Sequence, residues 1–281
     1  MNKFKHFLFK SFCTTNSSHS QAIISATMGQ SGNILGLYMN TPKNRNALSR
    51  SMIDSLKSHI TQVNSNHYIR AVILMSQEPG YFCSGADLKE RQRMNEKQTE
   101  EFVKELRETF QLLSELRVPS ICGIDGFALG GGLELSLSTD IRICTKSSTL
   151  GLTECSLGII PGAGGTQRLP RLIGVARAKE MVFTSERING EKALSIGLVN
   201  HVVDKYEELE SKSLEIAEKI ARNAPLAVVN AKKAIQEGIG YDIKAGLDVE
   251  TRCYGNIIRT EDRVEGLKAF LEKRAPNYQG K

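Results

Sequence analysis

Two acidic residues, Glu134 and Glu154, each stand close to a glycine-dense turn in an otherwise apolar stretch of the sequence. Leucines flank Glu134 on both sides, which favours an inward side chain over a solvated one. An unpaired buried carboxylate is costly, so burial of both side chains would indicate a function. Such a pair suits proton transfer, because one carboxylate can take a proton from water while the other delivers a proton to carbon.

The first glycine turn, Gly130-Gly131-Gly132, lies between a predicted strand at residues 120–124 and a predicted helix at residues 133–138. Amide groups at the positive end of a helix are free to bind an anion or a developing oxyanion. We therefore expect the N–H of Gly131 to be one donor of an oxyanion hole.

A second loop, residues 82–88, follows a predicted strand, and its small residues let the backbone approach a ligand. The N–H of Ala86 would be the second donor to the same carbonyl oxygen. Losing one such donor typically costs about 3–4 kcal/mol of barrier. A second interpretation stays open, in which residues 84–87 are a plain turn with Asp87 as a helix cap.

Other catalytic signatures are missing from the sequence. The five histidines show no HxH or HExxH spacing, and no Cys/His cluster is present, so no metal site is expected. No GxSxG or phosphate-binding Walker loop occurs. Residues 162–167 resemble a dinucleotide fingerprint, but Gln167 stands where the third glycine belongs.

Composition is that of a soluble globular protein, with 281 residues of which 40% are hydrophobic and 24% charged. Residues 1–53 hold six Lys/Arg and no acid, so 31 basic and 31 acidic residues balance in the rest. The charge of +6 thus belongs to the N-terminal end, which argues against a globally basic nucleic-acid binder.

The six cysteines form no CxxC pair and are expected to be reduced. No apolar run reaches the ~18 residues of a membrane span.

Residues 1–20 are rich in Lys, Phe and Ser/Thr and contain no acid. One helical face of this segment would carry Phe4, Phe7, Leu8 and Phe12. A basic, hydroxyl-rich, amphipathic leader is typical of a transit peptide, so we expect import into the mitochondrial matrix. A plain disordered tail is the alternative.

The rest of the chain alternates predicted strands and helices. Strands are expected at residues 22–26 and 34–40, as a hairpin, and at 71–75, 120–124, 141–145 and 150–152. Helices are expected from Ser49 or Ser51 to about Val63, along an apolar face from Phe102 to Leu116, and at 133–138. The repeated strand–strand–helix order predicts an α/β spiral of ββα units. After about Glu207 only helices are expected, at 209–222, 225–237, 247–258 and 261–273.

Three ordered motifs resemble the crotonase (enoyl-CoA hydratase/isomerase) superfamily. They are FCSGADLK at residues 82–89, DGFALGGGLEL at 125–135 and GIIPGAGGTQRLP at 158–170. The likeness continues through ALSIGLV at 193–199 and covers the chain from about residue 22 to its end. It implies a crotonase-like ββα spiral with a C-terminal helical trimerisation region, assembled as a trimer or a dimer of trimers.

The resemblance also implies roles for individual residues. Glu134 and Glu154 would perform syn addition of water across the α,β double bond of an enoyl-CoA, in fatty-acid or branched-chain amino-acid breakdown. Ala86 and Gly131 would polarise the thioester carbonyl. Members with one of the two glutamates tend to be isomerases, so the presence of both favours a hydratase. No cofactor is implied, because coenzyme A is part of the substrate.

Substrate contacts follow from the same resemblance. The pantetheine channel would be lined by Ala86, Asp87, Leu88 and Lys89. Gly162 would shape the loop beside the reacting carbons. Lys43, Arg45 and Lys273 are candidates for binding the CoA phosphates.

Residues 86–91 and 132–135 are most similar to the methylglutaconyl-CoA hydratase branch of the superfamily, for which RNA binding through a lysine row on the first helix is reported. Here Arg50 is followed at one-turn spacing by Asp54 and Ser58. An acid in that row repels a phosphate backbone, so RNA binding is not expected.

The predicted organisation is a leader at 1–20, a spiral core with the acyl-CoA site at 21–206, and a helical assembly region at 207–281. Two alternatives stay open: an isomerase or other acyl-CoA lyase on the same fold, and an RNA-binding protein with little turnover. Which acyl group the protein accepts depends on the geometry of residues 88–110, and the sequence does not determine that geometry.

Overall fold

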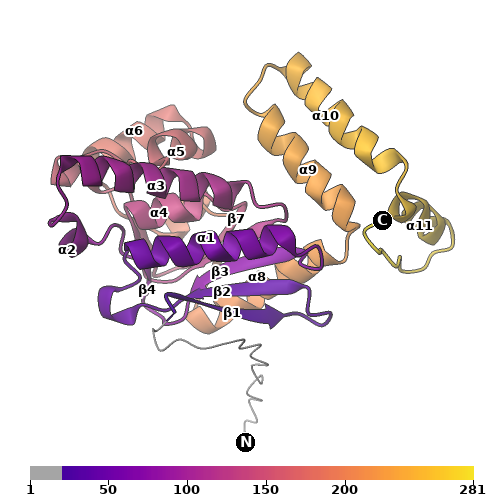
Figure 1. Cartoon of the computed structure of the whole chain (residues 1–281), viewed down its shortest axis with the longest axis horizontal. Coiled ribbons are helices and arrows are strands. Elements are labelled where there is room, and N and C mark those ends of the chain that lie inside the picture. Colours follow the sequence, from indigo (N-terminus) through magenta and orange to yellow (C-terminus); the bar gives the residue numbers. More distant parts are fainter. Residues whose placement is uncertain (1–20) are drawn as a thin grey trace, which may run out of the picture.

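A computed structural model describes residues 21–281 of the chain (Figure 1). The predicted transit leader at residues 1–20 lies outside the described residues. Two β-sheets form the centre of the described part. The larger sheet has six strands in the order β1 (Ile23–Met28), β2 (Ile34–Met39), β3 (Ala71–Ser76), β5 (Ser120–Ile124), β7 (Ile141–Thr145) and β10 (His201–Val203). The smaller sheet has four, in the order β4 (Tyr81–Cys83), β6 (Phe127–Leu129), β8 (Thr149–Gly151) and β9 (Ile188–Asn189).

The chain winds between the two sheets as a spiral. β1 and β2 pair as the predicted antiparallel hairpin, and the pairs that join β2, β3, β5, β7 and β10 are parallel. The pairs β3/β4, β5/β6 and β7/β8 each place their first strand in the larger sheet and their second in the smaller. This arrangement confirms the predicted spiral of ββα units.

Helices follow each turn of the spiral. α2 (Leu88–Arg91) and α3 (Glu96–Ser114) come after β4, and α4 (Gly131–Leu137) comes after β6. α5 (Gly165–Ile173) and α6 (Val175–Thr184) come after β8, and α7 (Gly190–Ser195) precedes β10. α1 (Arg50–Ser65) begins after Ser49, whose hydroxyl accepts a hydrogen bond from the amide of Met52, as an N-cap does.

Both faces of the larger sheet are covered, which explains the unbroken apolar run of β3. Val72 and Leu74 belong to the main core, which also contains the buried faces of α1 and α3. Ile73 and Met75 point to the other side and pack in a second cluster with residues of α8 (Tyr206–Ala221). A strand that is buried on both faces cannot alternate with polar residues.

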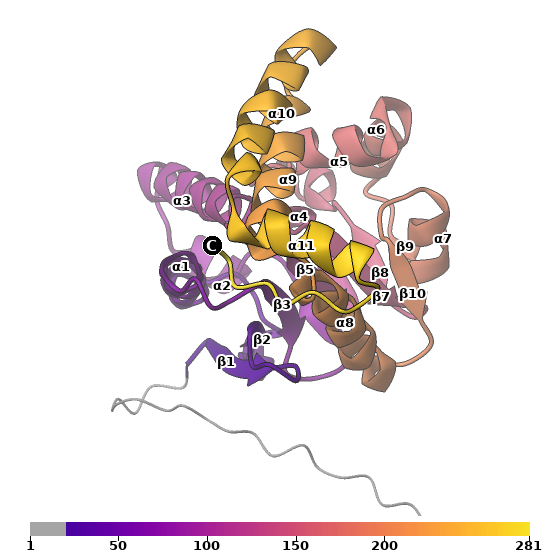
Figure 2. The ribbon, with the colours of Figure 1, turned by 90° about the vertical axis from the view of Figure 1, so that its right-hand side faces the viewer.

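The C-terminal part of the chain divides at the end of α8. Three further helices, α9 (Pro225–Gly238), α10 (Ile243–Ile258) and α11 (Glu261–Leu271), project from the sheets (Figures 1 and 2). The predicted region 207–281 therefore contains one helix that covers the sheet and three that leave it. No helix within residues 21–281 is long and apolar enough to cross a membrane.

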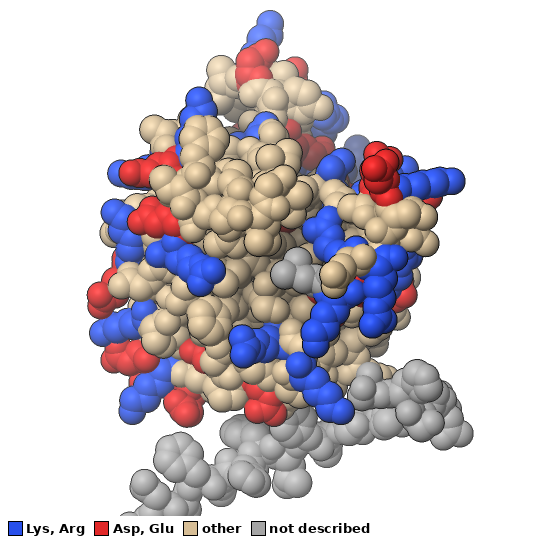
Figure 3. All heavy atoms as spheres, turned by 90° about the vertical axis from the view of Figure 1, so that its left-hand side faces the viewer, with Lys and Arg blue, Asp and Glu red and all other residues tan. Residues whose placement is uncertain are grey.

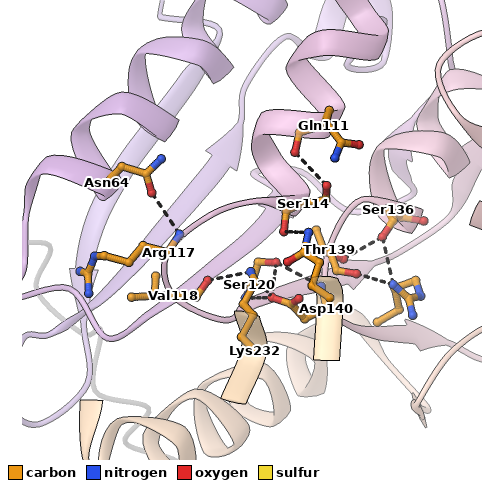
Figure 4. Close-up of polar contacts among 12 residues, drawn as sticks. Asn64, Gln111, Ser114, Arg117, Val118, Ser120, Ser136, Thr139, Asp140 and Lys232 are labelled. Carbon is orange, nitrogen blue, oxygen red and sulfur yellow. Dashed lines mark hydrogen bonds and ion pairs between the residues drawn. The ribbon is translucent and has the colours of Figure 1, made fainter. Parts of the chain in front are cut away.

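α9 is fastened to the core by a lysine (Figure 4). The ammonium of Lys232 donates to Asp140 Oδ2 at 2.8 Å and to the carbonyl of Val118 at 3.1 Å. Asp140 also accepts from the backbone N–H of Ser120 at 2.7 Å, so its carboxylate ties α9 to the start of β5. One turn further along α9, the Gln236 amide donates to the carbonyl of Ser114 at 3.0 Å.

Candidate active site

A cavity of about 560 Å³ lies between α2, α3 and α4 and the segment that follows β8. Five of the predicted site residues line it, namely Ala86, Gly131, Glu134, Glu154 and Gly162. The sequence motifs that contain them are far apart along the chain, and the spiral brings them to one place. Both predicted glutamates line this cavity.

Glu134 lies in the first turn of α4 and is 3% exposed. Its Oε1 accepts hydrogen bonds from the backbone N–H groups of Ala163 and Gly165, both at 2.8 Å. A Cβ atom at position 165 would lie 3.0 Å from this oxygen, so glycine allows the close approach. The second glycine turn therefore wraps around the carboxylate of Glu134.

Glu154 begins the short 3-10 helix Glu154–Leu157 and is 8% exposed. Its Oε1 lies close to Gly130, because a Cβ atom at position 130 would be 3.2 Å from this oxygen. Its Oε2 is buried and has no hydrogen-bond partner among the described residues. An orphaned carboxyl oxygen that lines a cavity is free to exchange a proton with a bound molecule.

The two carboxyl groups differ in acidity. Burial, and then the negative charge of Glu134, raises the pKa of Glu154 to about 7. Burial also raises the pKa of Glu134, but the amides of Gly165 and Ala163 and the charges of Arg168 and Arg107 act in the opposite direction. Hydrogen bonds to a carboxylate favour its ionised form. The hydrogen bonds therefore favour the ionised form of Glu134, and the raised pKa of Glu154 favours a proton on that group up to near neutral pH.

Two backbone amides meet beside the glutamates. Gly131 is the first residue of α4, so its N–H has no partner within the helix. Ala86 forms a parallel bridge with Leu48, whose hydrogen bonds use the amides of Leu48 and Asp87 and leave the N–H of Ala86 unused. A Cβ atom on Gly131 would lie 3.8 Å from the nitrogen of Ala86. This arrangement suits an oxyanion hole.

Asp87 and Lys89 do not line the cavity. Asp87 Oδ1 accepts from the amides of Lys89 and Glu90 at 3.0 and 3.1 Å, so Asp87 caps α2. This agrees with the capping part of the alternative interpretation, although Ala86 in the same segment lines the cavity. Lys89 lines a separate depression with Arg50 and Arg93. The backbone of Leu88 starts α2.

The candidates for the CoA phosphates separate into two groups. Lys43 and Arg45 are exposed. Their loop contacts the loop that contains Ser84, whose amide donates to the carbonyl of Arg45 at 3.2 Å. Lys273 follows α11, which lies across the molecule from α2 (Figure 1). Viewed from the α2 side, Lys and Arg side chains stand around a central uncharged area (Figure 3).

Sequence reasoning missed one wall of the cavity. Thr99, Val103 and Arg107 line it from α3 at one-turn spacing, and Arg91 lines it from α2. The sequence shows this four-residue spacing, but only the apolar, core-facing side of α3 was used to predict the helix. Leu157, Ile159 and Ile160 also line the cavity, and the last of these is 70% exposed. Apolar residues in a glycine-rich loop could have indicated that this loop lines the cavity.

Within residues 21–281, no group of three His, Cys, Asp or Glu side chains is arranged to hold a metal ion. The buried cysteines Cys83, Cys122 and Cys144 are unpaired, and burial raises the pKa of each thiol well above its ordinary value. The acidic pair and the two amides are the predicted groups that the structure brings together in the cavity.

Comparison with known proteins identifies relatives along nearly the whole chain. A family model described as enoyl-CoA hydratase/isomerase matches residues 29–281. The mitochondrial enoyl-CoA hydratase domain-containing protein 2 of Mus musculus is 43% identical over 274 residues, covering 96% of this chain and 92% of that protein. The mitochondrial methylglutaconyl-CoA hydratase of Homo sapiens is 43% identical over 250 residues, covering 88% and 74%.

Solved structures agree with the sequence comparisons. The crystal structure of an enoyl-CoA hydratase from Bacillus anthracis superposes with a TM-score of 0.90 at 48% identity, covering 93% of this chain and all of that one. The crystal structure of an enoyl-CoA hydratase from Geobacillus kaustophilus superposes with a TM-score of 0.88 at 33% identity, covering 94% of this chain and 98% of that one.

Proposed function

The chain belongs to the enoyl-CoA hydratase/isomerase family, and from this premise we propose that Glu134 and Glu154 add water across the α,β double bond of an enoyl-CoA thioester. The activity is that of a hydro-lyase. One observation carries the proposal: two buried carboxyl groups and two open amides line the same cavity. Water addition needs a group that takes a proton and another that delivers one, and the two glutamates supply both.

The proposed reaction proceeds in two linked steps. The thioester oxygen accepts hydrogen bonds from the N–H groups of Ala86 and Gly131. Glu134 takes a proton from water as the water oxygen bonds to the β-carbon, and the electron pair of the double bond moves onto the thioester oxygen. When the carbonyl re-forms, the α-carbon takes a proton from Glu154. Proton exchange with solvent then returns both carboxyl groups to their starting forms.

The environment of each glutamate supports its assigned role. Glu134 receives two backbone hydrogen bonds on one oxygen, which favour its ionised, proton-accepting form. Glu154 has an unpartnered buried oxygen and a pKa raised to about 7, so it holds a proton near neutral pH. A general acid works best when its pKa lies near the working pH.

The alternatives are not favoured by the described residues. An isomerase would need one proton-shuttling group, whereas two line the cavity. On α1, exposed Asp54 and Ser58 interrupt the row that begins with Arg50, and the Arg50 guanidinium lies 3.9 Å from Glu90. The row therefore does not present a continuous positive stripe to RNA.

The substrate is an acyl-CoA, and the reaction needs no cofactor besides the CoA that the substrate carries. The acyl group would extend between the α3 wall and the loop with Leu157 and Ile160. Lys43 and Arg45, which are exposed near the Ser84 loop, would bind the phosphates of CoA.

For the assembly we propose a homotrimer or a dimer of trimers. α9, α10 and α11 leave large apolar side chains exposed, among them Ile239, Ile243 and Phe270, each more than 80% exposed. An apolar surface of this kind indicates a protein partner. The leader composition and relatives whose names include "mitochondrial" support a mitochondrial protein, and we propose the matrix as its compartment.

The test is a hydration assay with purified protein across short, branched and long enoyl-CoA substrates. We expect loss of the double bond and gain of a β-hydroxyl group for at least one of them. An isomerised double bond without added water would favour the isomerase alternative, and no turnover of any substrate would contradict the proposal.

A further inference from the structure

Two arginines from different helices hold the glycine turn that surrounds Glu134. Arg107 lies on α3, and its Nε donates to the carbonyl of Gly162 at 3.0 Å. Arg168 lies on α5, and its Nη1 donates to the carbonyl of Ala163 at 3.2 Å. The two guanidinium groups thus bind consecutive carbonyls of the turn whose amides bind Glu134.

The turn is shaped to receive Arg168. Gly164 has a φ of +112°, and a Cβ atom there would lie 2.0 Å from Nη1 of Arg168. Any other residue would therefore displace the guanidinium as well as strain the backbone. The Nη2 of Arg168 donates to the Gln111 side chain at 2.9 Å, so the same arginine connects the turn to α3.

We propose that Arg107 and Arg168 are positioning residues that clamp the 162–165 turn, so that its amides hold Glu134 in the ionised, proton-accepting form. Neither arginine forms an ion pair with an acidic side chain within residues 21–281. Their contacts with the turn run mainly to backbone carbonyls, which is how a guanidinium fixes a loop. This inference rests on the proposed role of Glu134 as the base.

The charges around the glutamate pair agree with this geometry. The groups that face Glu134 are Glu154, Arg168 on α5 and Arg107 on α3, and the last two lower the pKa of Glu134. Arg91 on α2 faces the other carboxyl group and lowers the pKa of Glu154. Removing either clamp arginine takes away a positive charge and loosens two hydrogen bonds to the carboxylate, and both changes favour protonated Glu134.

The test compares the variants Arg107→Met and Arg168→Met with wild-type protein by the ratio of their kcat values for crotonyl-CoA across pH. Because the charge of Glu134 affects Glu154, the ratio reports the titration of the pair. We expect it to fall about tenfold for each unit by which the pKa of Glu134 rises, at pH values below that pKa, and to recover as the pH increases. KM should change little for Arg168→Met, because Arg168 does not line the cavity. A merely structural defect would lower the ratio equally at every pH.

Two matched controls remove the same charge from the same helices. Lys104 is exposed on α3 and pairs only with Glu108, and Arg171 is exposed on α5 and bonds only Gln167. We expect Lys104→Met and Arg171→Met to give flat ratios close to one. Arg107→Lys keeps a charge and a donor and should restore most of the low-pH activity. A flat ratio for both clamp variants, or equal effects in the controls, overturns the proposal.

A second measurement does not require turnover. The carboxyl carbon of Glu134 can be followed by NMR in protein labelled at Glu, with Glu134→Gln to assign the signal. The clamp predicts that Glu134 titrates at higher pH in Arg107→Met than in wild type or Lys104→Met. An unchanged titration refutes the clamp even if no substrate is hydrated, whereas absent hydration with a shifted titration refutes only the proposed function.

Discussion

Glu134 and Glu154 are chemically the same side chain, and their surroundings make them different. One carboxyl group is surrounded by the amides of a glycine turn, and the other keeps an oxygen without a partner. The sequence indicated both residues because leucines and glycines flank them. It did not indicate Arg107 or Arg168, because a contact between a side chain and a distant carbonyl leaves no local pattern.

Replacing either glutamate with glutamine removes proton transfer while it keeps the shape of the side chain. We expect Glu134→Gln and Glu154→Gln each to lower kcat by roughly 100- to 10,000-fold. Steady-state hydration kinetics check this, with circular dichroism to show that the variants are folded. Residual activity within about tenfold of wild type would contradict a direct role in proton transfer.

Glu154 should also make stability depend on pH. Its folded-state pKa of about 7 exceeds the ordinary value of 4.5, so ionisation costs free energy in the folded protein only. The folded protein therefore loses stability as pH rises from about 4.5 toward 7, and Glu154→Gln escapes this loss. We expect the variant to gain on the order of 2 kcal/mol over wild type at high pH and little at low pH. Urea unfolding at both pH values measures the difference, and an equal effect at both would contradict the pKa shift.

At the scale of elements, long apolar or amphipathic segments were predictable and short ones were not. β3, β5, β7 and α1 were expected near their observed bounds because each carries a clear burial pattern. The apolar face of α3 was also expected, but the helix begins at Glu96, before that face starts, where Asn95 and Gln98 form a capping box. β4, β6 and β9 have two or three residues each, too few for any periodicity. Their pairing depends on the spiral as a whole, and it is this small sheet that leads the chain into the cavity-lining loops.

The attachment of α9 gives an element-scale prediction. Lys232 is largely buried and binds Asp140, whereas its neighbour Lys233 is exposed and pairs with Glu237 at 3.8 Å. We expect Lys232→Met to lower the free energy of unfolding by about 1–3 kcal/mol, because Asp140 and the Val118 carbonyl lose a donor. Lys233→Met should change it by less than about 0.5 kcal/mol. Urea unfolding compares the two, and equal effects would show that the buried contact does not fasten α9.

At the scale of the whole molecule, the projecting helices expose large apolar side chains. Ile239 and Ile243 are 82% and 81% exposed where α9 turns into α10, and few apolar residues are so open on a stable monomer surface. We expect a trimer or a dimer of trimers in solution. Ile239→Glu with Ile243→Glu should shift the assembly toward smaller species, because buried charges oppose association. Sedimentation equilibrium decides this, and a wild-type monomer at micromolar concentration would contradict the proposed assembly.

The most direct test of the central claim is turnover of crotonyl-CoA in isotopically labelled water by wild type, Glu134→Gln and Glu154→Gln. We predict that wild type places labelled oxygen on the β-carbon and a solvent-derived hydrogen on the α-carbon. Each variant should do so at least about 100-fold more slowly. Labelling of the product by either variant at the wild-type rate would contradict the two-glutamate mechanism.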